Sequence, residues 1–304
     1  MKKVIVTTSI YPPNEVLQKY DQMSDWTLVV AGDLKTPKDF KLERGIYISP
    51  EEQEKYDKKL SDAIGWNCIM RRNFAFLWAK ELNADIIYTT DDDNIQLPNW
   101  GNSIVVGQTL KIKEYDNYNS VFDPISVTNH NHLWHRGFPI QLVNSKNQAV
   151  TAEMVEKKID IQANFWNGDP DIDAIERFIY NPECNFESRY FPFTVKKMAP
   201  FNSQNTFVTK EVLPHYCMWP GIGRADDIFS GLYAQHKGCN VGYFEPTVYQ
   251  DRNPHNLTKN MEDEYYLHSN CLKFIQLLQS GDNWESIIPE RTLLAKKLYE
   301  KHFE

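Results

Sequence analysis

Long apolar runs are missing from the sequence, and their absence excludes some classes of membrane and secreted protein. No window of about 18 uninterrupted apolar residues occurs in the 304 residues, so we expect no transmembrane helix. The first apolar run covers only residues 4–6, whereas the hydrophobic region of a secretory signal peptide needs about 7–15 residues. We therefore expect a soluble, cytoplasmic protein whose first core strand starts near Lys3.

Cysteines and blocks of basic residues are also scarce. The five cysteines are an odd number and include no Cys-x-x-Cys pair, which disfavours a disulfide framework or a structural zinc site. The chain has 33 Lys and Arg against 41 Asp and Glu, a formal net charge of −8, so sequence-blind nucleic-acid binding is not expected. A P-loop, a Gly-x-Gly-x-x-Gly motif after the first strand and a Gly-x-Ser-x-Gly elbow are all missing, which excludes the chemistries that use them.

The remaining composition is that of an ordinary globular protein, with 41% hydrophobic and 24% charged residues. Strand-like apolar segments alternate with helix-like segments in the first third of the chain. Strands are expected at residues 3–10, 26–31, 46–48 and 85–90, and helices at 14–23, after the cap residue Ser49, and at 65–82. This alternation predicts an α/β fold with a mostly parallel sheet flanked by helices.

The stretch from about residue 100 to 200 has no regular pattern and is rich in Asn, Asp, Pro, Trp and Tyr. Long irregular stretches of this kind are typical of functional loops. The regular pattern then returns with a helix at 225–237, a strand at 240–245, and helices at 261–278 and 289–301. We expect one α/β domain over residues 1–258 and a helical extension over 259–304 packed on it.

The strongest chemical signal is the acidic run of Asp91, Asp92 and Asp93, which directly follows an expected strand. Adjacent carboxylates repel one another unless a cation binds them. In parallel α/β sheets ligands bind outside the carboxyl ends of the strands, and oxygen ligands suit Mg²⁺ or Mn²⁺, which often bridge to a diphosphate. The run therefore indicates a metal–nucleotide site, with a solvated acidic turn as the alternative.

Two further charged pairs have both a chemical and a purely structural interpretation. Arg71 and Arg72 lie in the expected helix before the acidic run, where they would bind phosphate oxygens or form a solvated helix face. Asp226 and Asp227 follow a glycine-containing loop at the start of the 225–237 helix. They would act as a general base for an acceptor hydroxyl or cap the helix.

Other candidates are polar and aromatic residues farther along the chain. His255 is a candidate metal ligand, and Arg252 in the same segment is a candidate phosphate partner. Asn, Gln, Asp and Trp suit sugar hydroxyls and sugar faces, with ordinary turn chemistry as the alternative; the candidates of this kind are Trp166, Asp169, Asn202 and Gln204. A weaker alternative metal cluster consists of His130, His132 and His135.

Taken in order, these motifs resemble the GT-A glycosyltransferases, which have a nucleotide-binding first strand, an Asp-x-Asp after a later strand, an x-Glu-Asp at a helix start and a C-terminal histidine on the metal. More narrowly, they are similar to the STELLO-like glycosyltransferases, which are related to the UDP-arabinopyranose mutases (reversibly glycosylated polypeptides). The matching stretches are residues 6–13, 65–73, 88–94, 202–206, 224–228 and 252–255.

The resemblance implies a GT-A fold and a role for each matching residue. The nucleotide would be bound by Thr7, Thr8, Ser9, Asp33, Arg71, Arg72, Asp91, Asp92 and Arg252. The metal, Mn²⁺ or Mg²⁺, would be bound by Asp93 and His255. Asp226 stands where the family has Glu, which leaves open which carboxylate is the base, and we favour Asp227.

We therefore predict a metal-dependent glycosyltransferase that moves a sugar from a nucleotide donor, with UDP as the favoured nucleotide, to a carbohydrate or other hydroxyl acceptor. One alternative is a nucleotide-sugar mutase that acts on a UDP-sugar, suggested by the Trp-Asn-Gly-Asp-Pro-Asp segment at 166–171. The other is a non-catalytic GT-A scaffold, because Asp replaces Glu at position 226.

Overall fold

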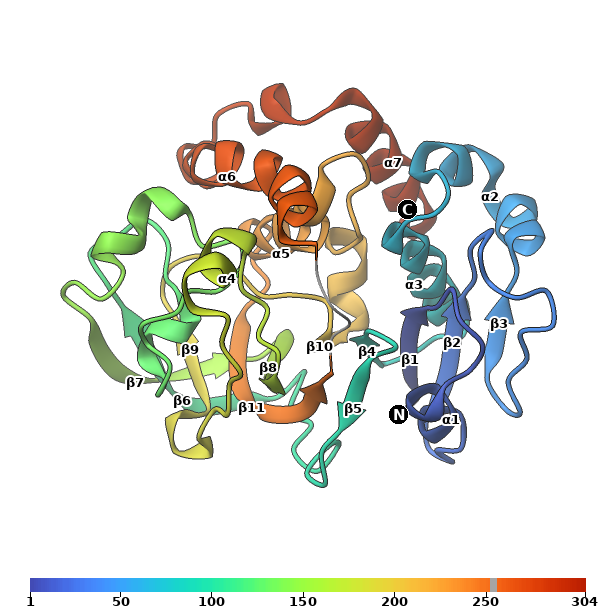
Figure 1. Ribbon diagram of the computed structural model, residues 1–304, viewed down its shortest axis with the longest axis horizontal. Coiled ribbons are helices and arrows are strands. Elements are labelled where there is room, and N and C mark those ends of the chain that lie inside the picture. Colours follow the sequence, from blue (N-terminus) through green and yellow to red (C-terminus); the bar gives the residue numbers. More distant parts are fainter. Residues whose placement is uncertain (252–255) are drawn as a thin grey trace.

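The computed structural model describes residues 1–251 and 256–304. Within these residues the chain forms one mixed sheet of eleven strands flanked by helices (Figure 1). The strand order is β3-β2-β1-β4-β10-β8-β11-β9-β6-β7, and β5 pairs with β11 outside this path. The α/β class predicted from the sequence is confirmed, with antiparallel pairs such as β10–β4 among the parallel ones.

The N-terminal strands form a parallel block close to the positions expected from the sequence. They are β1 (Lys3–Thr8), β2 (Thr27–Ala31), β3 (Ile46–Ile48) and β4 (Ile86–Thr90). Successive strand residues point to opposite faces, so Val4 and Val6 pack in one hydrophobic cluster and Ile5 in another. Helix α3 (Arg72–Glu81) covers the first face and α1 (Glu15–Asp21) the second.

Local capping explains the starts of α1 and α2 (Pro50–Ile64). The Asn14 side chain accepts a hydrogen bond from the Leu17 amide at the start of α1. Ser49 and Glu52 form a capping box at the start of α2, which confirms the cap expected at Ser49. The later helices are α4 (Ala174–Tyr180), α5 (Asp226–His236), α6 (Leu257–Ser280) and α7 (Glu290–Glu300).

The stretch that we expected to be irregular supplies strands to the sheet, and this expectation was wrong. This stretch contains β6 (Thr109–Asp116), β7 (Thr151–Lys158), β8 (Ile161–Gly168) and β9 (Phe193–Val195). Outside it lie β5 (Asn94–Gln96), β10 (Asn205–Thr209) and β11 (Val241–Gln250), the last of which was expected at 240–245. Strand β8 is buried between β10 and β11, so it has no alternation of apolar and polar residues. Its polar side chains are satisfied internally, because Asn164 donates to Thr247 Oγ1 and Gln162 Oε1 accepts from the Val105 amide.

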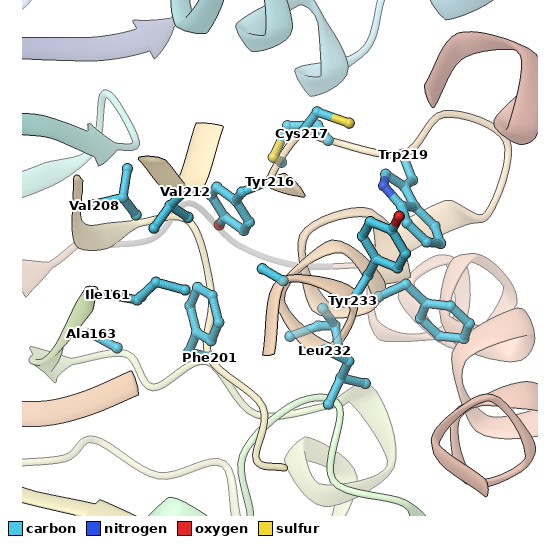
Figure 2. Close-up of a cluster of buried hydrophobic side chains, with 14 of the residues drawn as sticks. Ile161, Ala163, Phe201, Val208, Val212, Tyr216, Cys217, Trp219, Leu232 and Tyr233 are labelled. Atoms are coloured by element: carbon cyan, nitrogen blue, oxygen red, sulfur yellow. The ribbon is translucent and has the colours of Figure 1, made fainter. Parts of the chain in front are cut away.

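The core continues from strands β8 and β10 of the sheet into helix α5 (Figure 2). Phe201 stacks on Tyr216 with ring centroids 5.6 Å apart, and Trp219 packs on Tyr233 at 5.7 Å. Helix α7 is fastened to the same region, since Thr292 Oγ1 donates to the Pro220 carbonyl at 2.5 Å. Among the described helices, none is both long enough and apolar enough to cross a membrane.

Candidate active site

The predicted residues follow strands whose ends meet at one edge of the sheet. Ser9 follows β1, Asp33 follows β2 and the acidic run follows β4, and these three strands are parallel. Strand β10 is antiparallel to β4, so residues 202–204, which precede β10, reach the same edge. Ligands of α/β sheets bind at the carboxyl ends of parallel strands, so this edge is where a site is expected.

A cavity of about 420 Å³ opens at this edge. Carboxylates from several separate elements line it: Asp91, Asp93, Asp171, Asp226, Asp227 and Asp263. Asp263 belongs to α6, so the C-terminal helical segment contributes to the cavity wall. Gln204, a predicted sugar-binding residue, lines the same cavity and donates to Gln250 Oε1 at 2.5 Å.

A second cavity of about 280 Å³ adjoins the first, because Cys68 and Ile69 line both. Four predicted nucleotide-binding residues line it: Thr8, Ser9, Asp33 and Asp92. Asp33 also builds the wall, since its carboxylate accepts hydrogen bonds from the amides of Asn67 (2.8 Å) and Cys68 (2.9 Å). Burial raises the pKa of Asp92, and a hydrogen bond with Ser9 opposes this rise.

Arg72 is buried next to the larger cavity and forms an ion pair with Asp91 of the acidic run. It is 1% exposed, and its Nη2 donates to Asp91 Oδ1 at 2.5 Å. Its Nη1 donates to the carbonyl and hydroxyl oxygens of Ser203, which ties the end of β4 to the segment before β10. Asp91 and Asp93 therefore present hard oxygen donors to one cavity, a donor set that fits Mn²⁺ or Mg²⁺.

The two carboxylates at the start of α5 have very different surroundings. Arg136 donates to both carboxylate oxygens of Asp227 at 3.1 Å, and the Ser203 amide donates to Asp227 Oδ2 at 3.0 Å. Asp226 Oδ2 is buried and has no hydrogen-bond partner among the described residues. Burial, followed by the charge of Asp227, raises the pKa of Asp226 to about 7 from 3.8. Asp227, the carboxylate favoured from the sequence, is thus engaged by Arg136 and Ser203, whereas its neighbour Asp226 has the raised pKa.

Arg136 connects two carboxylates that line the larger cavity, those of Asp171 and Asp227. Its Nε donates to Asp171 Oδ1 at 2.9 Å, while its terminal nitrogens hold Asp227. Burial alone would lower the pKa of Arg136, but the carboxylates of Asp171 and Asp227 hold it well above the ordinary value. Asn202, a predicted sugar-binding residue, donates to Asp171 Oδ2 at 3.0 Å and so lies one layer behind the cavity.

Arg71, like Arg72, is not among the described residues that line the two cavities, and it makes no contact with the acidic run. It is fully buried, and it donates to Gln53 Oε1 at 2.7 Å and to the hydroxyl and carbonyl oxygens of Ser61. Its guanidinium also stacks on the Trp66 ring, 3.6 Å from the centroid. These contacts fasten the end of α2 to the start of α3, which is a structural role.

Three other predicted residues also lie outside the described linings of the two cavities. Trp166 is 2% exposed and stacks on Phe165 within the core, so no sugar face can reach it. Asp169 forms an ion pair with Arg177 at 2.5 Å. Thr7 is fully buried in β1.

The predicted residues Arg252 and His255 lie outside the described residues. Among the residues that are described, Asp173, Glu264 and His268 form a cluster of candidate metal ligands. Their ligand atoms lie within 4.8 Å of one another. Its carboxylates are already engaged, because Asp173 accepts from Trp134 Nε1 and Glu264 accepts from Arg224 and the Ala174 amide. The alternative cluster of His130, His132 and His135 forms no such group within that part of the chain.

Sequence reasoning missed four charged residues that line the larger cavity: Arg136, Asp171, Arg224 and Asp263. Asp171 and Arg224 lie inside segments that the sequence singled out, 166–171 and 224–228, without a role of their own, and no spacing marks Arg136 or Asp263. Arg136 meets Asp227 from 91 positions away, a pairing that only the folded chain creates.

The comparisons with known proteins agree with the motif resemblance. No protein-family model matches the chain. It is 25% identical to the probable glycosyltransferase STELLO2 of Arabidopsis thaliana, over 91% of this chain, and 25% identical to STELLO1 of the same plant, over 82%. The alignments cover 39% and 35% of those proteins, so the chain spans less than half the length of the relatives it matches.

Solved structures with a similar arrangement include glucosyl-3-phosphoglycerate synthase from Mycobacterium tuberculosis, crystallised with Mn²⁺, UDP-glucose and phosphoglyceric acid. That likeness covers 93% of this chain and 80% of the other at 12% identity, with a TM-score of 0.42, too low to support an argument about function. The sequence comparison is the stronger finding: over most of its own length this chain is similar in sequence to the probable glycosyltransferases STELLO2 and STELLO1.

Proposed function

We propose that this protein is a metal-dependent glycosyltransferase that uses a nucleotide-sugar donor, with UDP as the favoured nucleotide. The observation that carries the proposal is the pair of adjoining cavities at the carboxyl edge of the sheet. One is lined by Thr8, Ser9 and Asp33, and the other by the acidic residues that follow β4 and begin α5. The similarity to the STELLO glycosyltransferases supports the same conclusion.

In this proposal the nucleoside occupies the smaller cavity and the sugar diphosphate extends into the larger one. Asp91 and Asp93 would hold Mn²⁺ or Mg²⁺, and Arg72 fixes the rotamer of Asp91 from below. The cation, when bound, offsets the negative charge that develops on the departing diphosphate. Asp92 lines the smaller cavity, so the acidic run divides its side chains between the two halves of the site.

Asp226 is the proposed general base of an inverting transfer. The acceptor oxygen forms a bond to the anomeric carbon, the bond from that carbon to the diphosphate breaks, and the acceptor proton passes to Asp226. A pKa of about 7 suits this task, because a base works best when its pKa lies near the working pH. Asp227, held by Arg136 and Ser203, keeps the start of α5 in place beside it.

Thermal unfolding with UDP, with Mn²⁺ and with both together tests the proposal. A ligand at a hundredfold excess over its Kd stabilises the folded state by about 2.7 kcal/mol. We expect a shift in Tm that needs UDP and Mn²⁺ together, is lost in Asp93→Asn, and is kept in the control Asp62→Asn, an exposed carboxylate paired with Lys58 on α2. No shift with UDP, GDP or CDP in the presence of metal would refute the proposal.

A further inference from the structure

Arg224 lines the larger cavity and lies in the short 3₁₀ segment before α5. Its Nε donates to Glu264 Oε1 at 3.0 Å, and about a third of the side chain (30%) is exposed. Among the described residues, no side-chain or carbonyl oxygen accepts a hydrogen bond from its two terminal nitrogens. These N–H groups are therefore available to a ligand in the cavity.

The anchor of this arginine is rigid. Glu264 is 1% exposed, and its second oxygen accepts from the Ala174 amide at 2.7 Å. The main chain is held as well, because the Arg224 carbonyl accepts from Arg136 Nη1 at 2.5 Å. The preceding residue, Gly223, has a φ of +62°, and a Cβ there would lie 2.0 Å from the Asp263 carbonyl oxygen. The loop thus lies directly against α6, and the guanidinium is preorganised.

The charges around the cavity indicate which ligand this group takes. Six aspartates line the cavity against two arginines among the described residues. Arg136 is buried and its guanidinium is committed to Asp171, Asp227 and a carbonyl oxygen. A diphosphate next to Asp91 and Asp93 brings more negative charge than one divalent cation offsets. Of the two arginines in the described lining of the larger cavity, Arg224 is the one whose guanidinium has N–H groups left to bind this anion.

We propose that Arg224 binds the diphosphate of the nucleotide donor, forking phosphate oxygens with its terminal nitrogens while Glu264 holds its Nε. This assignment rests on the proposed function and gives a role to a residue for which the motif resemblance implied none. The planar fork of arginine matches phosphate oxygens, and each charge-assisted hydrogen bond is roughly twice as strong as a neutral one. The diphosphate is favoured over an anionic acceptor group because the same cavity holds the proposed metal ligands.

The test compares UDP with uridine, since the two differ only in the diphosphate. Calorimetric titration in Mn²⁺ gives the affinity of the unmodified protein, Arg224→Gln, Arg224→Lys and the control Arg189→Gln for each ligand. Arg189 is matched, because its Nε also contacts a glutamate (Glu187, 2.8 Å), but it is 69% exposed and lines neither cavity. Thermal unfolding of each variant without ligand shows whether it is folded.

Arg224→Gln should weaken UDP binding by about tenfold or more and leave uridine binding within about twofold. Arg224→Lys keeps the charge without the planar fork and is the milder change for folding, so it should lose less UDP affinity. Arg189→Gln should bind UDP as tightly as the unmodified protein. Equal losses for UDP and uridine, or unchanged UDP affinity in both Arg224 variants, would overturn the assignment while leaving the nucleotide site intact. Failure of the unmodified protein to bind UDP with Mn²⁺ would instead refute the proposed function, and this assignment with it.

Discussion

Exchanging Asp226 for asparagine should slow sugar transfer and at the same time stabilise the folded protein above neutral pH. The two effects have one origin, the burial that raises the pKa of Asp226 to about 7 from 3.8. The folded state binds this proton more tightly than the unfolded state does. The contribution of Asp226 to the free energy of unfolding is therefore most favourable below about pH 4. It falls as the pH rises from about 4 to 7 and stays low above that range.

The size of each effect follows from the structure. A shift of this extent corresponds to a cost on the order of a few kcal/mol for holding the ionised carboxylate in the folded state above pH 7. Asp226→Asn removes that cost, so its Tm at pH 8 should exceed that of the unmodified protein. Loss of a general base slows transfer by about 10²–10⁴-fold.

Asp227→Asn is the matched comparison, because it changes the next residue of the same helix. This substitution breaks a buried, bidentate pair with Arg136, a change that destabilises proteins by about 3–5 kcal/mol. Its main consequence should be a lower Tm at every pH, with Asp171 left as the remaining partner of Arg136.

The assay is the pH dependence of kcat/KM for release of UDP from a UDP-sugar, with Tm measured at the same pH values. The unmodified enzyme should gain activity through an apparent pKa near 7, and Asp226→Asn should lose that limb of the profile. The reasoning would be refuted by a stable Asp227→Asn variant that lacks the limb, together with an Asp226→Asn variant that keeps it.

Three further outcomes follow from the geometry. Asp93→Asn should abolish the metal-dependent part of UDP binding, measured by titration with and without Mn²⁺, while the Tm of the ligand-free protein changes little. Arg71→Gln should lower the free energy of unfolding by about 1–3 kcal/mol in urea titrations, through lost hydrogen bonds to Gln53 and Ser61, and leave UDP affinity unchanged. Trp166→Ala should cost about 3–5 kcal/mol of stability without a specific effect on the KM of the sugar donor, because the ring packs in the core; a KM effect at unchanged Tm would contradict this.

The parts of the fold that the sequence predicted well are those with local causes. The strands of the N-terminal block depend on local apolar runs, and the start of α2 depends on the capping residue Ser49. Strand β8 escaped prediction because its Asn and Gln side chains are buried and satisfied by partners far along the chain, such as Thr247. No local pattern distinguishes such a strand from a polar loop.

The chemistry of the site divides in the same way. The sequence by itself determined that carboxylates follow β4 and begin a later helix, because those residues are adjacent and their elements have local signatures. Only the tertiary structure decided how the two neighbours at the start of α5 differ. Arg136, 91 positions from Asp227, reaches that carboxylate and fixes it, whereas Asp226 is buried and its Oδ2 has no partner among the described residues. Burial and long-range charge pairing set the protonation of a group, and both arise when distant segments pack together.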